Sequence, residues 1–161
     1  MYEKGYKSVS DSRCEAYKLI KAPDLNSSGM LFGGRLLEWL DEIAALAAWR
    51  HAGNPVTTAS IEHLDFKRSA RLNDIIVMEA FVIYVGHTSM EVCVDTYVED
   101  QPTGMRHVIN RAFFTEVCID KDGKPTPVPY GLKIESISEQ AYYQAALRHK
   151  AMRKKHNTDI M

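Results

Sequence analysis

The stretch that decides the fold is GGRLLEWLDEIAALAAWR, residues 33–50. Apolar residues recur in it at helical spacing, which predicts an amphipathic helix with one buried face. Asp41 interrupts this pattern, because it lies in line with Ala44 and Ala48 on the apolar face. An ionised carboxylate that faces a core is destabilising unless it is paired or has a function, so Asp41 marks a candidate site.

A glycine-containing loop, NSSGMLFGG over residues 26–34, leads into this helix. Backbone N–H groups at a helix N-terminus attract negative charge, and Gly33 and Gly34 allow a ligand to approach closely because they lack a Cβ. Asn26 begins the loop and is by itself a typical turn or cap residue. The polar loop, the helix N-terminus and the carboxylate on the buried face together predict a functional site.

The composition is that of an ordinary globular chain. The 161 residues fit one domain, with 45% hydrophobic and 25% charged side chains. A net charge of −1 argues against a dedicated nucleic-acid-binding protein. No apolar run approaches the ~18 residues that span a bilayer, and the N-terminus lacks the apolar core of a signal peptide. The absence of such a run also predicts no membrane partner. The three cysteines have no CxxC spacing, so we expect reduced thiols in a cytoplasmic protein, with no metal.

Alternating and β-branched segments predict one strand before the long helix and a series of strands after it. The predicted strands span residues 13–20, 56–66, 75–85, 89–98 and 106–119. A second helix with a basic end is predicted over residues 135–155, and residues 1–12 are expected to be frayed. This order predicts an α+β fold, in which a curved antiparallel sheet wraps around the long helix. The outer face and the edges of such a sheet favour dimerisation.

The pattern NxxGxxFGGxLLxxxDExAxxAA over residues 26–48 resembles the signature of hotdog-fold acyl-CoA thioesterases. The resemblance continues in TAS at 58–60, DF at 65–66, GHTSMEV at 86–92, FFT at 113–115 and DGKPxPVP at 122–129. It is closer to single-domain bacterial acyl-CoA hydrolases related to the cytosolic long-chain enzymes of animals. It implies a hotdog domain over residues 13–130 and a basic helix and tail over residues 131–161. It also implies a homodimer as the minimal unit, often assembled into a hexamer as a trimer of dimers.

The activity that the resemblance implies is hydrolysis of acyl-CoA to a free fatty acid and CoA. The thioester oxygen gains negative charge in this reaction, which the N–H groups of Gly33 and Gly34 are suited to stabilise. Asp41 is the candidate general base or nucleophile, and the sequence does not distinguish these roles. By resemblance, Asn26 lies beside the thioester. No cofactor is expected, because CoA is part of the substrate and product.

The spacing of these residues predicts a site shared between subunits. Gly33 and Asp41 are eight residues apart, which is about 12 Å along a helix at ~1.5 Å per residue. One carbonyl group cannot contact both within one chain. We therefore predict a composite site, with Gly33 and Gly34 from one subunit and Asp41 from the other.

CoA also carries phosphate groups, which require a basic or amide-rich surface. Lys67 and Arg68 follow the strand predicted to cross near the helix start. By resemblance, the hairpin that contains Thr88 and Ser89 holds the pantetheine and phosphate region. Arg68 and Ser89 are the best single candidates for CoA binding, and a solvated basic patch is the alternative.

Other roles remain open at this point. A hotdog hydratase or dehydratase would need a histidine near the helix, and residues 23–34 contain none. A non-catalytic acyl-CoA sensor would need a DNA-binding segment, for which the residues before the first strand are too few. His63 and His87 are predicted to be a strand residue near the dimer seam and a hairpin residue, not catalytic bases. The alternative role of Asp41 is that of a structural anion paired with an arginine.

Overall fold

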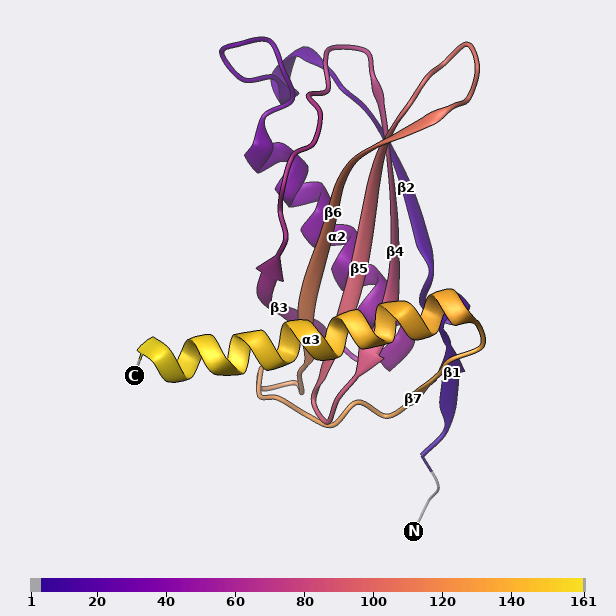
Figure 1. Cartoon of the computed structure of the whole chain (residues 1–161), viewed down its shortest axis with the longest axis vertical. Coiled ribbons are helices and arrows are strands. Elements are labelled where there is room, and N and C mark those ends of the chain that lie inside the picture. Colours follow the sequence, from indigo (N-terminus) through magenta and orange to yellow (C-terminus); the bar gives the residue numbers. More distant parts are fainter. Residues whose placement is uncertain (1–3, 161) are drawn as a thin grey trace.

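The computed structural model describes residues 4–160 (Figure 1). Its elements follow in the order β1 (Tyr6–Ser8), α1 (Val9–Ser12), β2 (Cys14–Leu19), η1 (Ala22–Asp24), α2 (Gly33–Ala52), β3 (Val56–Glu62), β4 (Ile75–Val85), β5 (Ser89–Glu99), β6 (Arg106–Cys118), β7 (Gly131–Lys133) and α3 (Ile137–Ile160). The predicted long strands and both predicted helices are present, with some of their ends shifted.

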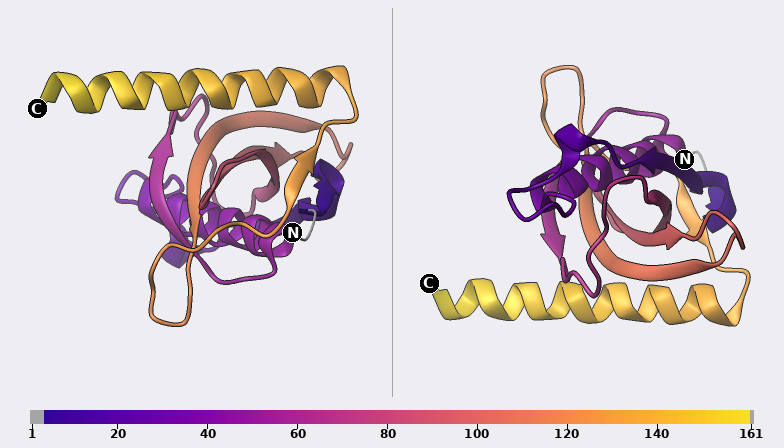
Figure 2. Two further views of the ribbon diagram at one scale, coloured as in Figure 1. Left: turned by 90° about the horizontal axis from the view of Figure 1, so that it is seen from below. Right: turned by 90° about the horizontal axis from the view of Figure 1, so that it is seen from above.

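One antiparallel sheet forms the body of the molecule, with five strands in the order β2-β4-β5-β6-β3. Figure 2 shows that this sheet curls around α2. Alternate side chains of β5, such as Met90 and Val92, are buried on the side of α2 with Leu40 and Ala44 of the helix. The predicted fold class, a curved antiparallel sheet around one long helix, is confirmed.

The outer face of the sheet is covered in part by α3, which crosses the strands (Figures 1 and 2). Ala146 of α3 is buried in a second apolar cluster with Phe81, Cys93 and Phe113, which face away from α2. The sequence predicted that this face favours dimerisation. Since α3 occupies part of it, the sheet edges β2 and β3 remain as the surfaces where another copy can add strands.

Arg153 is a polar anchor of α3 on the sheet. Its guanidinium donates to Glu62 of β3 at 2.9 Å and to Glu91 of β5 at 2.5 Å. Glu91 is buried, and burial raises its pKa although Arg153 acts in the opposite direction. The basic helix end is therefore partly a structural element, and not only a solvated face.

The central helix begins at Gly33, as predicted, and ends at Ala52, two residues later than predicted. Gly53 follows with a φ of 71°, in the left-handed region, and its N–H donates to Trp49 O at 2.7 Å. A residue without a Cβ adopts this conformation readily, which explains why the helix ends here.

The expectation of a frayed segment over residues 1–12 is wrong for residues 6–12. β1 pairs in parallel with β7, and Val9 of α1 is buried. Ser12 is buried as well, and its Oγ accepts a hydrogen bond from the N–H of Val82 at 2.9 Å. The partners of this segment lie far away in the sequence, so local pattern did not reveal them. Residues 1–3 lie outside the described residues.

Two predicted elements differ in length. The strand predicted over residues 56–66 ends at Glu62, because His63 has a φ of 59°, which strand residues do not adopt. The second helix, predicted over residues 135–155, begins at Ile137 and continues to Ile160. Its start is capped by Ser136, whose Oγ accepts from the N–H of Glu139 at 3.1 Å.

Two compositional expectations can be compared with the structure. Among residues 4–160, none of the helices combines the length and the apolar character needed to cross a membrane. Cys14, Cys93 and Cys118 are free thiols, as the absence of paired spacing predicted.

Candidate active site

Asn26 organises the loop that precedes α2. Its N–H donates to Met30 O at 2.7 Å, and its Oδ1 accepts from the N–H groups of Ser28 at 2.9 Å and Met30 at 3.2 Å. These bonds form an Asx-type turn. The Nδ2 amide of Asn26 has no hydrogen-bond partner within residues 4–160, so it is free to donate to a ligand.

The N-terminus of α2 has no side-chain cap, because Phe32 occupies the N-cap position. Within the described residues, no acceptor takes the N–H of Gly33 or Gly34, and the first turn contains no acidic residue. Both N–H groups are therefore available to bind a negatively charged oxygen. The Phe32 ring lies so close to Gly34 that an added Cβ would meet its Cε1 at 2.6 Å.

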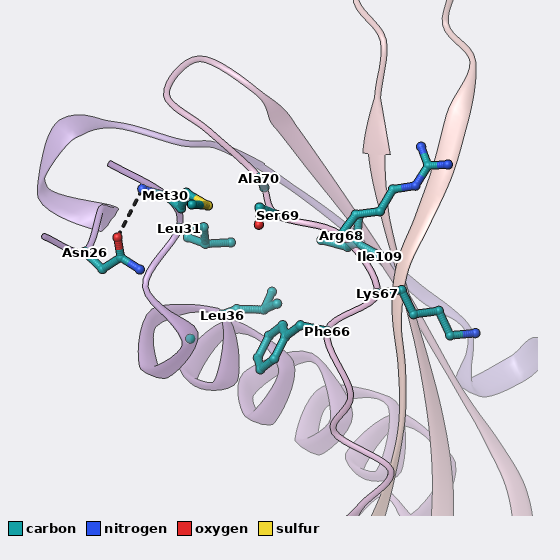
Figure 3. A pocket seen from close by; sticks show the side chains of 11 residues that line it. Asn26, Met30, Leu31, Leu36, Phe66, Lys67, Arg68, Ser69, Ala70 and Ile109 are labelled. Atoms are coloured by element: carbon teal, nitrogen blue, oxygen red, sulfur yellow. Dashed lines mark hydrogen bonds between the residues drawn. The ribbon is translucent and has the colours of Figure 1, made fainter. Parts of the chain in front are cut away.

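A cavity of about 270 Å³ opens beside this helix start (Figure 3). Asn26, Gly33, Lys67 and Arg68 contribute to its lining. The connection between β3 and β4 is held there because the N–H of Lys67 donates to Ile109 O of β6 at 2.9 Å. Figure 3 shows the charged ends of Lys67 and Arg68 directed away from Asn26. Two predicted catalytic residues and two predicted phosphate-binding residues thus meet at one cavity.

Asp41 does not line this cavity, and it faces β3 instead. Its Oδ1 accepts a hydrogen bond from the Thr58 hydroxyl at 2.6 Å. No ion pair formed by residues 4–160 includes Asp41. Arg35, the nearest arginine along α2, pairs with Asp24 at 3.3 Å and with Glu38 at 2.8 Å. Within residues 4–160, Asp41 is therefore not a structural anion paired with an arginine.

Thr58 also contacts a second carboxyl group. Its Oγ1 lies 2.8 Å from Oε1 of Glu116, which is the partner of Thr58 in the register of β3 and β6. The Glu116 side chain is 0% exposed, and burial raises its pKa to about 7. One hydroxyl group thus joins a carboxyl group of the central helix to a carboxyl group of the sheet.

The two halves of the predicted catalytic site remain separate within one chain. Gly33 and Asp41 stand on one continuous helix, eight residues apart, or about 12 Å. Gly33 opens to the cavity with Asn26, whereas Asp41 contacts Thr58. The geometry of the single chain is the one that the composite-site prediction requires.

Thr88 and Ser89 lie at the opposite end of the sheet from Arg68. Thr88 O accepts from the N–H of Cys118 at 2.8 Å, and Cys118 pairs with Val56, just beyond the C-terminus of α2. Arg68 lines the cavity at the N-terminus of the same helix. A single chain therefore does not bring the four predicted CoA-binding residues together.

The two histidines considered as bases lie elsewhere. The ring of His63 is 4.6 Å from that of His149 in α3, on the outer side of the sheet. Glu62, His63 and His149 present ligand atoms within 4.8 Å of one another. Glu62 is already paired with Arg153, whose positive charge opposes binding of a metal cation here. His87 is an exposed residue of the turn between β4 and β5.

Comparisons with known proteins give the family. The thioesterase superfamily model matches residues 28–105. YkhA of Bacillus subtilis, named as an uncharacterised acyl-CoA thioester hydrolase, is 37% identical over 121 residues, which cover 72% of this chain and 70% of that protein. The chain belongs to the hotdog-fold acyl-CoA thioesterases. Mouse acyl-coenzyme A thioesterase 11 is 34% identical over 86% of the chain, although the match spans only 24% of that longer protein.

Solved thioesterase structures agree with this assignment. An apo-hexameric acyl-CoA thioesterase has a TM-score of 0.90 at 40% identity, covering 95% of this chain and 97% of the other. An acyl-CoA hydrolase of Staphylococcus aureus, solved with butyryl coenzyme A and coenzyme A, has a TM-score of 0.86 at 35% identity, covering 96% of each chain. The similarity therefore extends over nearly the whole of this thioesterase.

Two residues of this thioesterase site have no role in the sequence-based prediction. Thr58 belongs to one of the quoted motif blocks, but the block alone does not show that its hydroxyl contacts Asp41. Glu116 alternates in phase with the buried Ala112 and Phe114 of β6. A carboxylate on the apolar face of a strand is the same signal that singled out Asp41 on the helix, and it was available in the sequence.

Proposed function

We propose that this thioesterase hydrolyses acyl-CoA to a free fatty acid and CoA at a site that two subunits share. The observation that carries the proposal is the environment of Asp41, whose partner is the Thr58 hydroxyl instead of a cation. A carboxylate held in this way is available to activate water or to attack a carbonyl group. The uncapped N-terminus of α2 supplies donors for the charge that develops on the thioester oxygen.

Variants of the Staphylococcus aureus hydrolase support the assignment of Asn26, Asp41 and Thr58 to the active site. Structures of that enzyme include alanine variants of an asparagine, an aspartate and a threonine whose positions are 15 and 17 residues apart. Asn26, Asp41 and Thr58 have the same order and the same spacings in this chain. The shared pattern supports a common role for the three side chains.

In the proposed assembly, Asn26 and Gly33 of one subunit act with Asp41 and Thr58 of another. Thr58 belongs to β3, which is an edge strand of the sheet and can pair with a second copy. A homodimer is then the smallest active unit. Related thioesterases that are described as hexameric support a trimer of dimers as the complete assembly.

In the proposed reaction, the N–H groups of Gly33 and Gly34 bind the thioester oxygen, and the Asn26 amide orients the water or the carbonyl. Asp41 either removes a proton from the attacking water or attacks the carbonyl carbon to form an anhydride that water then hydrolyses. In both routes the C–S bond breaks, one water molecule is consumed to form the free acid, and the thiolate of CoA leaves and takes up a proton. In direct attack the acyl group gains the water oxygen, whereas in the anhydride route the oxygen that it gains is first supplied by Asp41. Because the N–H donors stabilise the oxygen and Asp41 supplies the base or nucleophile, the proposed reaction needs no cofactor and no metal.

We assign the CoA phosphates to Lys67 and Arg68, which line the cavity. Their charged ends point away from Asn26, and the phosphates of CoA lie away from the thioester that Asn26 is proposed to contact (Figure 3). Thr88 and Ser89 contribute only from a neighbouring subunit, since they lie at the other end of the sheet in their own chain. We also propose a cytoplasmic location, which the three free thiols support.

The first test is an assay of CoA release. The purified protein is incubated with acyl-CoAs of several chain lengths and a thiol reagent that reports free CoA. We expect release with the wild type, and a decrease in kcat of at least about 100-fold for Asp41→Asn, because the variant has lost its base or nucleophile. The mass measured by light scattering should stay the same.

The exposed neighbour provides the control for this test. Glu42→Gln changes the same kind of charge one position along α2 and should retain the activity of the wild type. Detectable binding of acyl-CoA without release of CoA at any chain length would favour the sensor function. An Asp41→Asn variant as active as Glu42→Gln would remove Asp41 from the mechanism.

A further inference from the structure

Three oxygen atoms form a short chain between α2 and the sheet. Thr58 Oγ1 lies 2.6 Å from Asp41 Oδ1 and 2.8 Å from Glu116 Oε1. Both distances are those of hydrogen bonds between oxygen atoms. The Thr58 hydroxyl is therefore placed between two carboxyl groups that come from different elements.

The number of protons shared by these three oxygen atoms follows from the geometry. A hydroxyl group has one proton to donate and lone pairs to accept with. If both carboxyl groups were ionised, the Thr58 proton could serve only one of them, and the other would face an oxygen lone pair. Two hydrogen bonds therefore require one additional proton, carried by one of the two carboxyl groups.

The difference in burial favours Glu116 as the group that carries this proton. Glu116 is fully buried, whereas Asp41 is partly exposed. Glu116 has no ion pair with any of residues 4–160, and its Oε2 is buried without a hydrogen-bond partner among them. Its neighbours in the sheet register are Thr58 and the apolar Met90, and the charged group that faces it from α2 is Asp41. Ionising Glu116 would place a second negative charge in this apolar environment.

We propose that Glu116 is a positioning residue that donates a hydrogen bond to Thr58 and thereby directs the Thr58 proton onto Asp41. The Asp41 carboxylate is then held in one orientation, with its second oxygen free to act on water or on the thioester. Glu116 does not touch the substrate and acts through Thr58. This inference rests on the proposed catalytic role of Asp41.

The titration of Glu116 supports the inference and gives it a pH dependence. Burial raises the pKa of Glu116 to about 7, and the negative charge of Asp41 acts in the same direction. Below this value Glu116 is a donor. Above it, Glu116 becomes a second acceptor that competes with Asp41 for the Thr58 proton. The kcat of the wild type should therefore decline as the pH rises through this pKa.

The test compares two variants of Glu116 in the assembled enzyme. Glu116→Gln keeps the size of the side chain and supplies an amide donor at every pH. We expect its kcat to stay within about threefold of the wild-type value near neutral pH, and not to decline where the wild type declines. Glu116→Leu removes the donor, and we expect kcat to fall about tenfold or more while KM changes little.

A control variant and a second background separate positioning from packing. Cys118→Ala alters another buried side chain of β6 and should leave kcat unchanged, as circular dichroism and light scattering confirm the fold and the assembly. In a Thr58→Val background, Glu116→Leu should cause no further loss, because Glu116 acts through the hydroxyl.

Different results would overturn different statements. Equal kcat values and pH profiles for the wild type and Glu116→Leu would reject the role of Glu116 while Asp41→Asn still abolishes activity. A Glu116→Gln variant as impaired as Glu116→Leu would show that the carboxylate form is the one required. Absence of CoA release by the wild-type enzyme would instead reject the proposed function itself.

Discussion

Asp41 and Glu116 carry the same functional group, a carboxyl, but differ in burial. Both carboxyl groups lie where α2 packs on the sheet, and both contact the hydroxyl of Thr58. Asp41 is partly exposed and Glu116 is fully buried. Burial therefore favours the neutral acid at Glu116, and the proposed mechanism assigns the role of base or nucleophile to Asp41.

The raised pKa of Glu116 has a consequence for stability that Glu116→Gln can measure. In the unfolded chain this carboxyl group ionises near its ordinary pKa, and in the folded protein it ionises at about 7. The folded protein therefore binds this proton more tightly than the unfolded chain does. The resulting contribution to the free energy of unfolding is present at low pH and is lost as the pH rises between the two pKa values. We expect the stability of Glu116→Gln relative to the wild type to increase by about 2 kcal/mol from pH 5 to pH 8.

The measurement is the urea midpoint of each protein at the two pH values and at matched protein concentration. Glu42→Gln serves as the control, because Glu42 is exposed and its substitution should give the same difference at both pH values. Parallel pH curves for Glu116→Gln and the wild type would mean that Glu116 ionises as freely in the fold as in the unfolded chain.

At the scale of elements, the strands β5 and β6 have two buried faces with different contents. Their inner face packs on α2, with side chains such as Met90 and Phe114. Their outer face packs on α3 and includes Glu91 of β5, which is buried and bonded to Arg153. The long tail helix is therefore attached to the sheet by an apolar cluster, by the contact of Lys150 with Tyr84, and by Arg153, which pairs with two carboxylates.

Replacing Arg153 by methionine should destabilise this attachment. The change leaves Glu91 buried without its cation, which costs about 3 kcal/mol for a buried ion pair that loses one partner. Lys154→Met is the matched control, because Lys154 is exposed on the same helix. We expect the urea midpoint at pH 8 to fall for Arg153→Met only.

The effect of Arg153→Met should also be smaller at pH 5 than at pH 8. Burial already raises the pKa of Glu91, and removal of Arg153 raises it further, so that Glu91 can take up a proton in mild acid. Equal urea midpoints for Arg153→Met and Lys154→Met at both pH values would show that the ion pair contributes nothing to the attachment of α3.

At the scale of the whole molecule, one chain contains all proposed catalytic groups but holds them in two places. Asn26 and Gly33 lie at the cavity beside the N-terminus of α2, and Asp41 lies about two turns along the helix, against β3. A rigid helix cannot bring these groups to one carbonyl. The proposed dimer resolves this separation, because each of its two sites takes one half from each subunit.

Complementation between two inactive variants tests this arrangement. Asn26→Ala and Asp41→Ala should each be inactive as pure assemblies. When they are mixed in equal amounts during assembly, half of the dimers contain both variants, and each of these has one intact site. We therefore expect about one quarter of the wild-type activity from random pairing of subunits.

Each variant alone, carried through the same mixing procedure, provides the baseline. Activity no higher than this baseline, in mixed assemblies whose composition is confirmed by mass spectrometry, would mean that Asn26 and Asp41 act within one chain.

The sequence by itself determined the features that depend on local periodicity. The helix that begins at Gly33, the strands β4 to β6 and the position of Asp41 on a buried face follow from spacings within a few residues. The left-handed conformation of His63 and the order of residues 6–12 did not follow, because they depend on the surrounding fold.

Only the tertiary structure decided what each buried polar group touches. The register of β3 on β6 places Thr58 beside Glu116, and the packing of α2 adds Asp41 to the same hydroxyl. The same packing brings Lys67 and Arg68 to the start of the helix and leaves Thr88 and Ser89 at its far end. These contacts join residues that are far apart in the chain, and local spacing contains no information about such distances.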